Sequence, residues 1–494
     1  PSTHYGTFIT MFKLITVFWA FILIAVLILV GRLIRQRIGL LRSLFIPSSI
    51  VAGVVALLLG PGVLGAIANS VTPGSPLATG VFAPEIRDVW SQSPSIFINI
   101  VFACLFLGEP IPGPGDIWRK AAPQVAFGQT LAWGQYVVGL LLSMLILTPV
   151  FGMSPIAGAL IEITFEGGHG TAAGMAGTLQ ELGFPEGADL ALGLATVGIV
   201  SGIVAGTWLI NWGHRHHHIQ VNQLETGTLD DELTLEDGHH HPLDSAETRA
   251  ARVRLIQDLL IDPLSLNFAF VGLAIIIGWF ILEGLKALEA ATWGTTGLKL
   301  IPYVPLFPMA VIGGIVVQIV LVKLNRTYLI SRPLIARIGG VALDVPIVTA
   351  LATISLAAIG ANFGPFVLLA IAGILWNVLV FVFLGPRLLP SYWFERGVGD
   401  MGQSMGVTST GLLLIRMVDP QNRSGALESF AYKQLFFEPI VGGGLFTAAA
   451  PALITQFGPF PVFLLTSALL VFWLVFGFVN FKRMRQADVP SQLS

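Results

Sequence analysis

Long apolar runs dominate this sequence and constrain its fold more than any other feature. A helix that crosses roughly 30 Å of hydrocarbon needs about 20 mostly apolar residues. We count about eleven runs of this kind, near residues 8–30, 44–68, 93–108, 124–147, 187–210, 264–282, 302–322, 345–360, 363–384, 432–456 and 459–481. The sequence therefore predicts an all-α polytopic membrane protein.

Composition agrees with that class. Hydrophobic residues make up 54% of the chain and charged residues only 11%, whereas soluble domains carry about 25% charged residues. The single cysteine, Cys104, lies in an apolar run, so it forms no intrachain disulfide and we expect a small buried hydrophobe. The net charge of −2 gives no sign of a nucleic-acid partner.

The positions of Lys and Arg predict the orientation, because cytoplasmic loops carry an excess of positive charge. With the N-terminus outside and eleven spans, 22 of the 26 Lys and Arg residues fall on the cytoplasmic side. We therefore expect a multi-pass protein of the inner membrane, with its central linker and its C-terminus in the cytoplasm.

The one long polar interval, 214–262, divides the chain. It contains histidine runs at 214–218 and 239–241 and an acidic run at 230–237. Imidazole is a common metal ligand, but the interval has no fixed ligand spacing and no cysteine, so we expect a solvated linker and no metal beyond Na⁺. Five runs precede it, and an odd-span duplication gives inverted repeats. The predicted parts are an N-terminal repeat (1–213), the linker, an inverted repeat (263–458) and an extra span with a tail (459–494).

Each predicted repeat contains a polar, glycine-rich stretch between apolar runs. The stretches 161–183 and 395–416 align when Glu166 is placed on Asp400. Such interruptions at matching places indicate a transporter binding site, because irregular backbone at membrane depth is tolerated only where it is buried or lines a cavity. We expect re-entrant hairpins at about 155–183 and 388–418, supported by the amides Gln135 and Asn377 of the preceding spans.

Each hairpin should be two half-helices that meet at a broken tip. The N-terminus of a half-helix attracts anions, and hydroxyls and open carbonyls suit Na⁺. The alternative is that the glycines only permit close packing and the hydroxyls bond to their own helices. The candidate substrate-binding residues are Gly168, His169, Gly170, Thr171, Gly402, Gln403, Ser404, Gly406, Thr408, Ser409, Thr410 and Arg416.

Ionisable residues at membrane depth are costly and are candidates for function. Arg416 could clamp a substrate carboxylate; it could instead pair with Asp419 or reach the membrane surface. Glu166 and Asp400 could hold a cation, carry a proton or cap a half-helix. Gly397–Asp400 also matches the GxGD signature of intramembrane aspartyl proteases, which need a second aspartate. This short match in a glycine-rich chain is weak, and we expect no enzyme.

Two motifs give the chain a family resemblance. GGHGTAAG, which begins at Gly167, and GQSMGVTST, which begins at Gly402, resemble the re-entrant loops of bacterial sodium/glutamate symporters. The resemblance implies two inverted five-span repeats, Na⁺-driven uptake of glutamate without another cofactor, and an elevator-type motion against a dimeric scaffold.

The chain also departs from that family pattern. Ser409 stands where the family has a proline, Glu166, Asp400 and Arg416 are not its usual residues, and the last span is an addition. These departures keep a proton- or Na⁺-coupled symporter of another organic anion as the alternative.

Overall fold

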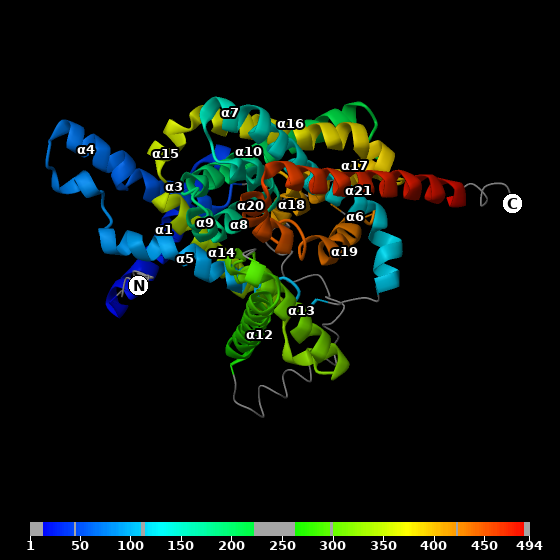
Figure 1. Ribbon diagram of the computed structural model, residues 1–494, viewed down its shortest axis with the longest axis horizontal. Coiled ribbons are helices and arrows are strands. Elements are labelled where there is room, and N and C mark those ends of the chain that lie inside the picture. Colours follow the sequence, from blue (N-terminus) through cyan, green and yellow to red (C-terminus); the bar gives the residue numbers. More distant parts are fainter. Residues whose placement is uncertain are drawn as a thin grey trace. The chain divides into compact units, whose positions relative to one another are not determined.

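The computed structural model describes residues 13–43, 46–109, 114–221, 262–296, 300–420 and 423–488, and none of these residues lies in a strand (Figure 1). Within these described residues, eight helical stretches are long and apolar enough to cross a membrane. They are Leu14–Arg37, Ser48–Val71, Ala121–Phe151, Glu186–Arg215, Pro263–Ala291, Arg332–Thr353, Phe363–Leu388 and Pro459–Arg483. The predicted all-helical, polytopic class is confirmed.

Three predicted runs differ in position or length from the helices observed, and a fourth is divided into two helices. The run 93–108 falls mostly in α5 (Pro84–Ala103), which begins earlier, and the run 302–322 becomes the 17-residue helix α13 (Phe307–Lys323). The predicted span 345–360 is wrong in position, because α14 (Arg332–Thr353) begins 13 residues earlier. The helix α15 (Leu356–Ala361) then follows separately.

The predicted span 432–456 is two helices rather than one. α19 (Ala426–Phe437) and α20 (Leu445–Phe457) are separated by a glycine loop, residues 438–444. In this loop Gly442 and Gly443 have φ angles of 71° and 101°, a region that favours glycine. Hydropathy averages over such a break, because glycine is not polar.

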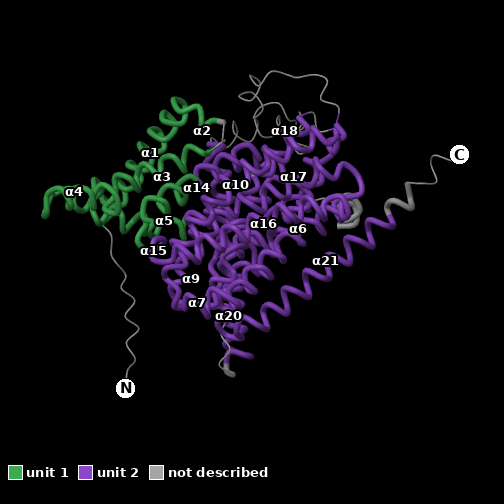
Figure 2. The backbone as a smooth tube through the Cα atoms, turned by 90° about the horizontal axis from the view of Figure 1, so that it is seen from above, with its two compact units in different colours: residues 1–96, 344–357 green, residues 97–343, 358–494 purple. Residues whose placement is uncertain are grey.

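The chain forms two compact units (Figure 2). Unit 1 comprises residues 1–96 and 344–357, and unit 2 comprises residues 97–343 and 358–494. The helices that lie wholly in unit 1 are α1 (Leu14–Arg37), α2 (Gly39–Ser43), α3 (Ser48–Leu58), η1 (Pro61–Gly65), α4 (Ala66–Val71) and η2 (Pro76–Thr79). Within it, α1 and α3 pack so closely that a Cβ on Gly31 would lie 2.4 Å from the Ser48 carbonyl oxygen.

Unit 2 contains most of the helices and all of the predicted site. In addition to α13 and α19–α20, its helices are α6 (Pro114–Leu142), η3 (Ser143–Leu147), α7 (Thr148–Phe151), η4 (Pro155–Ala159), η5 (Glu162–Glu166), α8 (Gly168–Gly174), α9 (Ala176–Glu181), α10 (Glu186–Arg215), α12 (Pro263–Ala291), η7 (Trp293–Thr296), η8 (Ile301–Tyr303), η9 (Thr327–Leu329), α16 (Phe363–Leu388), α17 (Trp393–Gln403), α18 (Thr408–Val418) and α21 (Pro459–Asp488).

The centre of unit 2 is α6, which packs against α16, α17, α19 and α21. α6 and α16 cross at Gly134, where a Cβ would lie 1.7 Å from the Trp376 ring. The Trp376 indole N–H donates to the Leu131 carbonyl at 2.9 Å, which fixes the crossing. The pair α12 and α13 is equally close, because a Cβ on Gly313 would lie 2.0 Å from the Ala274 carbonyl oxygen (Figure 1).

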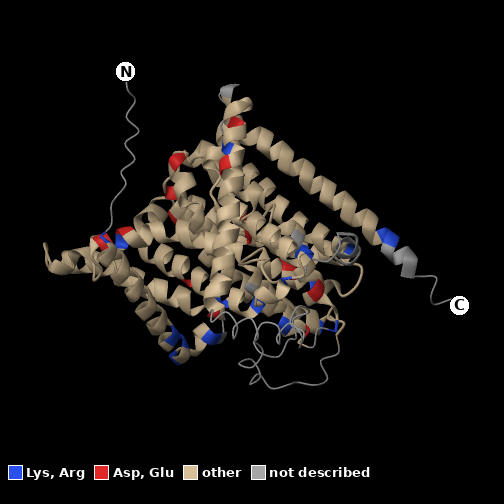
Figure 3. Cartoon of the chain, turned by 90° about the horizontal axis from the view of Figure 1, so that it is seen from below, with Lys and Arg blue, Asp and Glu red and all other residues tan. Residues whose placement is uncertain are grey.

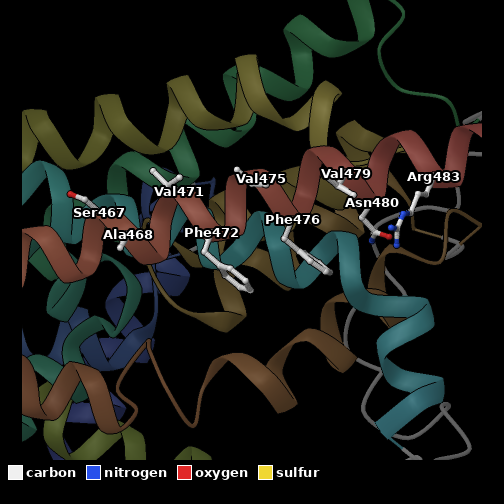
Figure 4. Close-up of a pocket in the computed structure, with 9 residues that line it drawn as sticks. All are labelled: Ser467, Ala468, Val471, Phe472, Val475, Phe476, Val479, Asn480 and Arg483. Carbon is white, nitrogen blue, oxygen red and sulfur yellow. The ribbon is translucent and has the colours of Figure 1, made fainter.

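The last helix, α21, packs along α6 and α16 and leaves an open, largely apolar groove of about 700 Å³ on its own surface. Figure 4 shows that Phe472 and Phe476 point to the same side of the helix. The polar members of the groove are Ser467, Asn480 and Arg483. Positions with Lys, Arg, Asp or Glu are sparse along the helices (Figure 3), as expected of helices that face lipid.

Candidate functional site

The first predicted hairpin is a helix that is repeatedly interrupted. The chain passes through the 3₁₀ turn η4, the π-helical turn η5 and the short helices α8 and α9. Gly168, with a φ angle of 68°, marks the change of direction after η5. Every residue of η5 and α8 is buried, so the polar side chains Glu162, Glu166, His169 and Thr171 all lie inside the protein.

The second predicted hairpin consists of α17 and α18, joined by residues 404–407. The two helices pack backbone against backbone, because a Cβ on Gly411 would lie 2.4 Å from the Gly399 carbonyl oxygen. A Cβ on Gly402 would lie 3.1 Å from the Gly411 Cα. These glycines therefore do serve close packing, as one interpretation of the sequence held, and they also hold the 404–407 turn in place.

The two turns meet directly. A Cβ on Gly168 would lie 2.4 Å from Val407 Cγ1 and 2.9 Å from the Gly406 carbonyl oxygen. α10 packs against both turns, and a Cβ on its Gly198 would lie 2.4 Å from the Met405 carbonyl oxygen. Segments more than 230 residues apart in the sequence thus share one buried location, which we call the tip junction (residues 166–171 and 402–410).

Gln135 and Asn377 hold the second turn from behind. The Gln135 amide donates to Asn377 Oδ1 at 3.1 Å and to the Ser404 carbonyl oxygen at 2.7 Å. The Asn377 amide donates to the same carbonyl at 3.0 Å. The two amides that the sequence matched between the halves therefore bond to each other and to one atom of the tip junction.

His169 is oriented by α10. Its Nε2 lies 2.9 Å from the Thr196 hydroxyl, which itself donates to the Leu192 carbonyl at 3.0 Å. Because that donation uses the hydroxyl proton, Nε2 must carry the proton of the imidazole. Nδ1 is then an acceptor, and it has no partner among the described residues.

Unpaired polar atoms are concentrated at the tip junction. Buried polar groups in proteins are normally hydrogen-bonded. Several buried polar atoms of the tip junction, however, have no hydrogen-bond partner among the described residues. They are both carboxyl oxygens of Glu166, Thr171 Oγ1, Ser404 Oγ, His169 Nδ1 and, just behind, Gln135 Oε1. Each of them can accept a hydrogen bond or face a cation.

Glu162, to which the sequence assigned no role, is fully paired. It accepts hydrogen bonds from the Tyr136 hydroxyl at 2.5 Å and from the Thr447 hydroxyl and the Gly442 amide at 2.8 Å each. These bonds attach the glycine loop to the first hairpin. The same loop borders the junction, since a Cβ on Gly443 would lie 2.6 Å from Thr171 Oγ1.

Asp400 belongs to a buried network that the sequence did not reveal. Its Oδ1 lies 3.0 Å from the Lys433 ammonium, and its Oδ2 accepts from the Gln124 amide at 2.7 Å. Lys433 also donates to Gln403 Oε1 at 2.8 Å, and Gln434 donates to that same oxygen at 2.9 Å. Lys433 lies in α19 with no exposed side-chain surface, although the predicted eleven-span arrangement counted it among the 22 cytoplasmic Lys and Arg residues.

The remaining candidates divide into two groups. Thr408 donates to Glu438 at 3.1 Å, and Gly170, Gly406 and Thr410 are, by position, part of the tip junction. Ser409 is in the first turn of α18. Arg416, in contrast, is exposed in the last turn of α18, two turns away from Thr408, so the structure does not bring it to the other candidates.

Of the polar linker, only residues 214–221 and Asp262 are described, and the runs 230–237 and 239–241 lie outside the described residues. The backbone N–H groups of Gln220 and Val221 donate to the buried carboxylate of Glu395 at 2.6 and 3.0 Å. The His218 ring contacts Trp393 at 5.3 Å between centroids. Partial burial and the neighbouring His216 imidazole lower the pKa of His218 below its usual value. No group of three metal-ligating side chains occurs in the part of the chain that the structure describes.

Comparison with known proteins gives one clear result. A family model described as "Sodium/glutamate symporter" matches residues 124–412, which is more than half of the chain and includes the first hairpin and the second hairpin up to residue 412. No curated protein matches the sequence.

Proposed function

This chain belongs to the sodium/glutamate symporter family, and from that premise we propose that it carries glutamate or a similar anionic amino acid through the tip junction together with Na⁺. The family consists of transporters, so the chain is not an enzyme. The GxGD match has a structural explanation, because Asp400 pairs with Lys433 and Gln124.

The observation that carries this proposal is the set of unpaired acceptors at the tip junction. An unsatisfied buried polar group costs about 1–3 kcal/mol, so several in one place favour a guest that supplies positive charge or hydrogen-bond donors. Na⁺ supplies the first, and the α-ammonium group of an amino acid supplies the second. We assign Glu166 with the Thr171 and Ser404 hydroxyls to the cation, since hard cations take oxygen ligands.

The carboxylates of the substrate need donors instead. The N-terminus of α18, at Thr408 and Ser409, presents backbone amides and the positive end of a helix dipole. We assign Gly168, Gly170, Gly402, Gly406 and Thr410 to the walls of the substrate site. Gln135 and Asn377 hold the Ser404 carbonyl behind it. Because Arg416 is exposed at the far end of α18, we assign the carboxylates to these amides and not to a guanidinium clamp.

For the architecture, we propose that residues 1–213 and 263–458 are inverted repeats whose hairpins, 155–183 and 388–418, enter the membrane from opposite faces. The direct contact between the turns and the bond between Gln135 and Asn377 support this arrangement. An elevator-type motion, a homodimer, an inner-membrane location, an outside N-terminus and a cytoplasmic linker and C-terminus remain part of the same proposal.

The test is uptake of labelled glutamate by proteoliposomes that contain the purified protein. We expect an inward Na⁺ gradient to raise the initial rate at least tenfold over a K⁺ gradient, with unlabelled glutamate as the strongest competitor in a panel of organic anions. Uptake driven by a pH gradient without Na⁺, or stronger competition by another anion, would instead establish the alternative symporter.

A further inference from the structure

Lys433 is the only buried lysine or arginine among the residues that the structure describes. Its side chain is 0% exposed, and a charge at membrane depth is costly unless it is paired. Space for it is provided by α6, where a Cβ on Gly128 would lie 2.8 Å from Lys433 Cδ. The position is therefore built to hold a long cationic side chain.

The surroundings hold the ammonium on one side of the tip junction. Asp400 lies 3.0 Å away and Gln403 Oε1 accepts from it at 2.8 Å. The Phe437 and Phe430 rings lie 4.1 and 5.0 Å from the nitrogen, within the range of a cation–π contact. These groups together direct the charge toward the second hairpin.

Two further buried carboxylates lie in the electrostatic field of the same ammonium. They are Glu166, 3% exposed and with no hydrogen-bond partner for either oxygen among the described residues, and Glu438, which accepts from the Thr408 hydroxyl. One resident cation thus faces three buried carboxylates and pairs with only one of them. If Asp400 did not hold it, Glu166 would be the obvious acceptor for its charge.

We propose that Lys433 is a resident cation that sets the Na⁺ affinity of the transporter. Asp400 and Gln403 keep the ammonium away from Glu166, so that the Glu166 carboxylate stays available to the transported cation. The inference rests on the proposed Na⁺ coupling and adds a residue outside the set of ion ligands. The Lys433 ammonium would compete with Na⁺ for the Glu166 carboxylate, and its ion pair with Asp400 therefore determines the Na⁺ concentration that transport needs.

The decisive variant is Asp400→Asn, which removes the charge that restrains Lys433 and keeps the side-chain shape. The released ammonium is expected to pair with Glu166 and compete with Na⁺. We expect the Na⁺ concentration for half-maximal effect to rise at least tenfold, while the rate at saturating Na⁺ changes less than threefold. The double variant Asp400→Asn/Lys433→Met lacks both the restraint and the competitor, and its Na⁺ requirement should return to within threefold of the wild-type value.

A second measurement and a control variant separate this result from effects on folding and from the choice of substrate. Na⁺-dependent thermal stabilisation of the purified protein reports cation binding without glutamate, and Lys323→Met, at an exposed cation of α13, is the control variant. An unchanged Na⁺ midpoint in Asp400→Asn, or an equal shift in the double variant, would overturn the role of Lys433. Absence of Na⁺ stabilisation in the wild-type protein would refute the proposed Na⁺ coupling itself.

Discussion

At the residue scale, the contact between the two hairpin turns depends on Gly168, because this position has no room for a side chain. Its φ angle is 68°, and a Cβ would lie 2.4 Å from Val407 Cγ1. Alanine is strained in that backbone conformation and would push the turns apart. We expect Gly168→Ala to reduce glutamate uptake at least tenfold in proteoliposomes that contain equal amounts of protein.

The matched control is Gly177→Ala in α9, where a Cβ meets no atom within 4 Å and no positive φ is required. Alanine has the higher helix propensity, so this variant should transport normally and be at least as stable. Equal uptake by Gly168→Ala and the wild-type protein would show that contact between the turns is not needed for transport.

The same scale shows what the sequence could and could not predict. Gln135 and Asn377 were identifiable because an amide in an apolar helix is conspicuous, and the structure places them in contact. Lys433 was not identifiable, since it is the second residue of the predicted run 432–456 and was therefore counted among the charges on the cytoplasmic side. The prediction that Arg416 binds substrate failed for the opposite reason. Arg416 follows an apolar run and was expected at membrane depth, yet its side chain is exposed. Which side of a short helix faces the core depends on tertiary packing.

At the element scale, the break between α19 and α20 is stabilised by side chains far away in the sequence. Glu162 accepts hydrogen bonds from the Gly442 amide, Thr447 and Tyr136, and the loop glycines have φ angles that favour glycine. Hydropathy predicted one continuous span here because it records no such bonds. The apolar helices themselves were predictable, since their length follows from the bilayer thickness.

This bonding predicts that Tyr136→Phe destabilises the junction of the glycine loop and the first hairpin. The substitution removes a 2.5 Å hydrogen bond to a fully buried carboxylate, and a bond to a charged group contributes about 1.5–3 kcal/mol. We expect a melting temperature several degrees lower in detergent solution. The control is Tyr303→Phe, at a half-buried tyrosine of η8 whose hydroxyl makes no hydrogen bond to a described residue. This variant should leave the melting temperature unchanged. Equal melting temperatures for the two variants would show that the bond to Glu162 adds no stability.

At the scale of the whole molecule, the buried charges bear on the energetics of transport. Lys433 pairs with Asp400, whereas neither Glu166 nor Glu438 forms an ion pair with a described residue. Two buried carboxylates are thus available for two cations. Glutamate carries one net negative charge at neutral pH, so symport with two Na⁺ would move one net positive charge inward.

Such a stoichiometry makes uptake sensitive to membrane potential, because one charge gains about 2.3 kcal/mol per 100 mV. We expect an inside-negative potential of about 100 mV, set by valinomycin and an outward K⁺ gradient, to raise glutamate accumulation by as much as about 40-fold at a fixed Na⁺ gradient, since 1.4 kcal/mol corresponds to a factor of ten. The same vesicles without valinomycin are the control. Accumulation that ignores the potential would mean one Na⁺ per glutamate, and Glu438 would then have no part in cation binding.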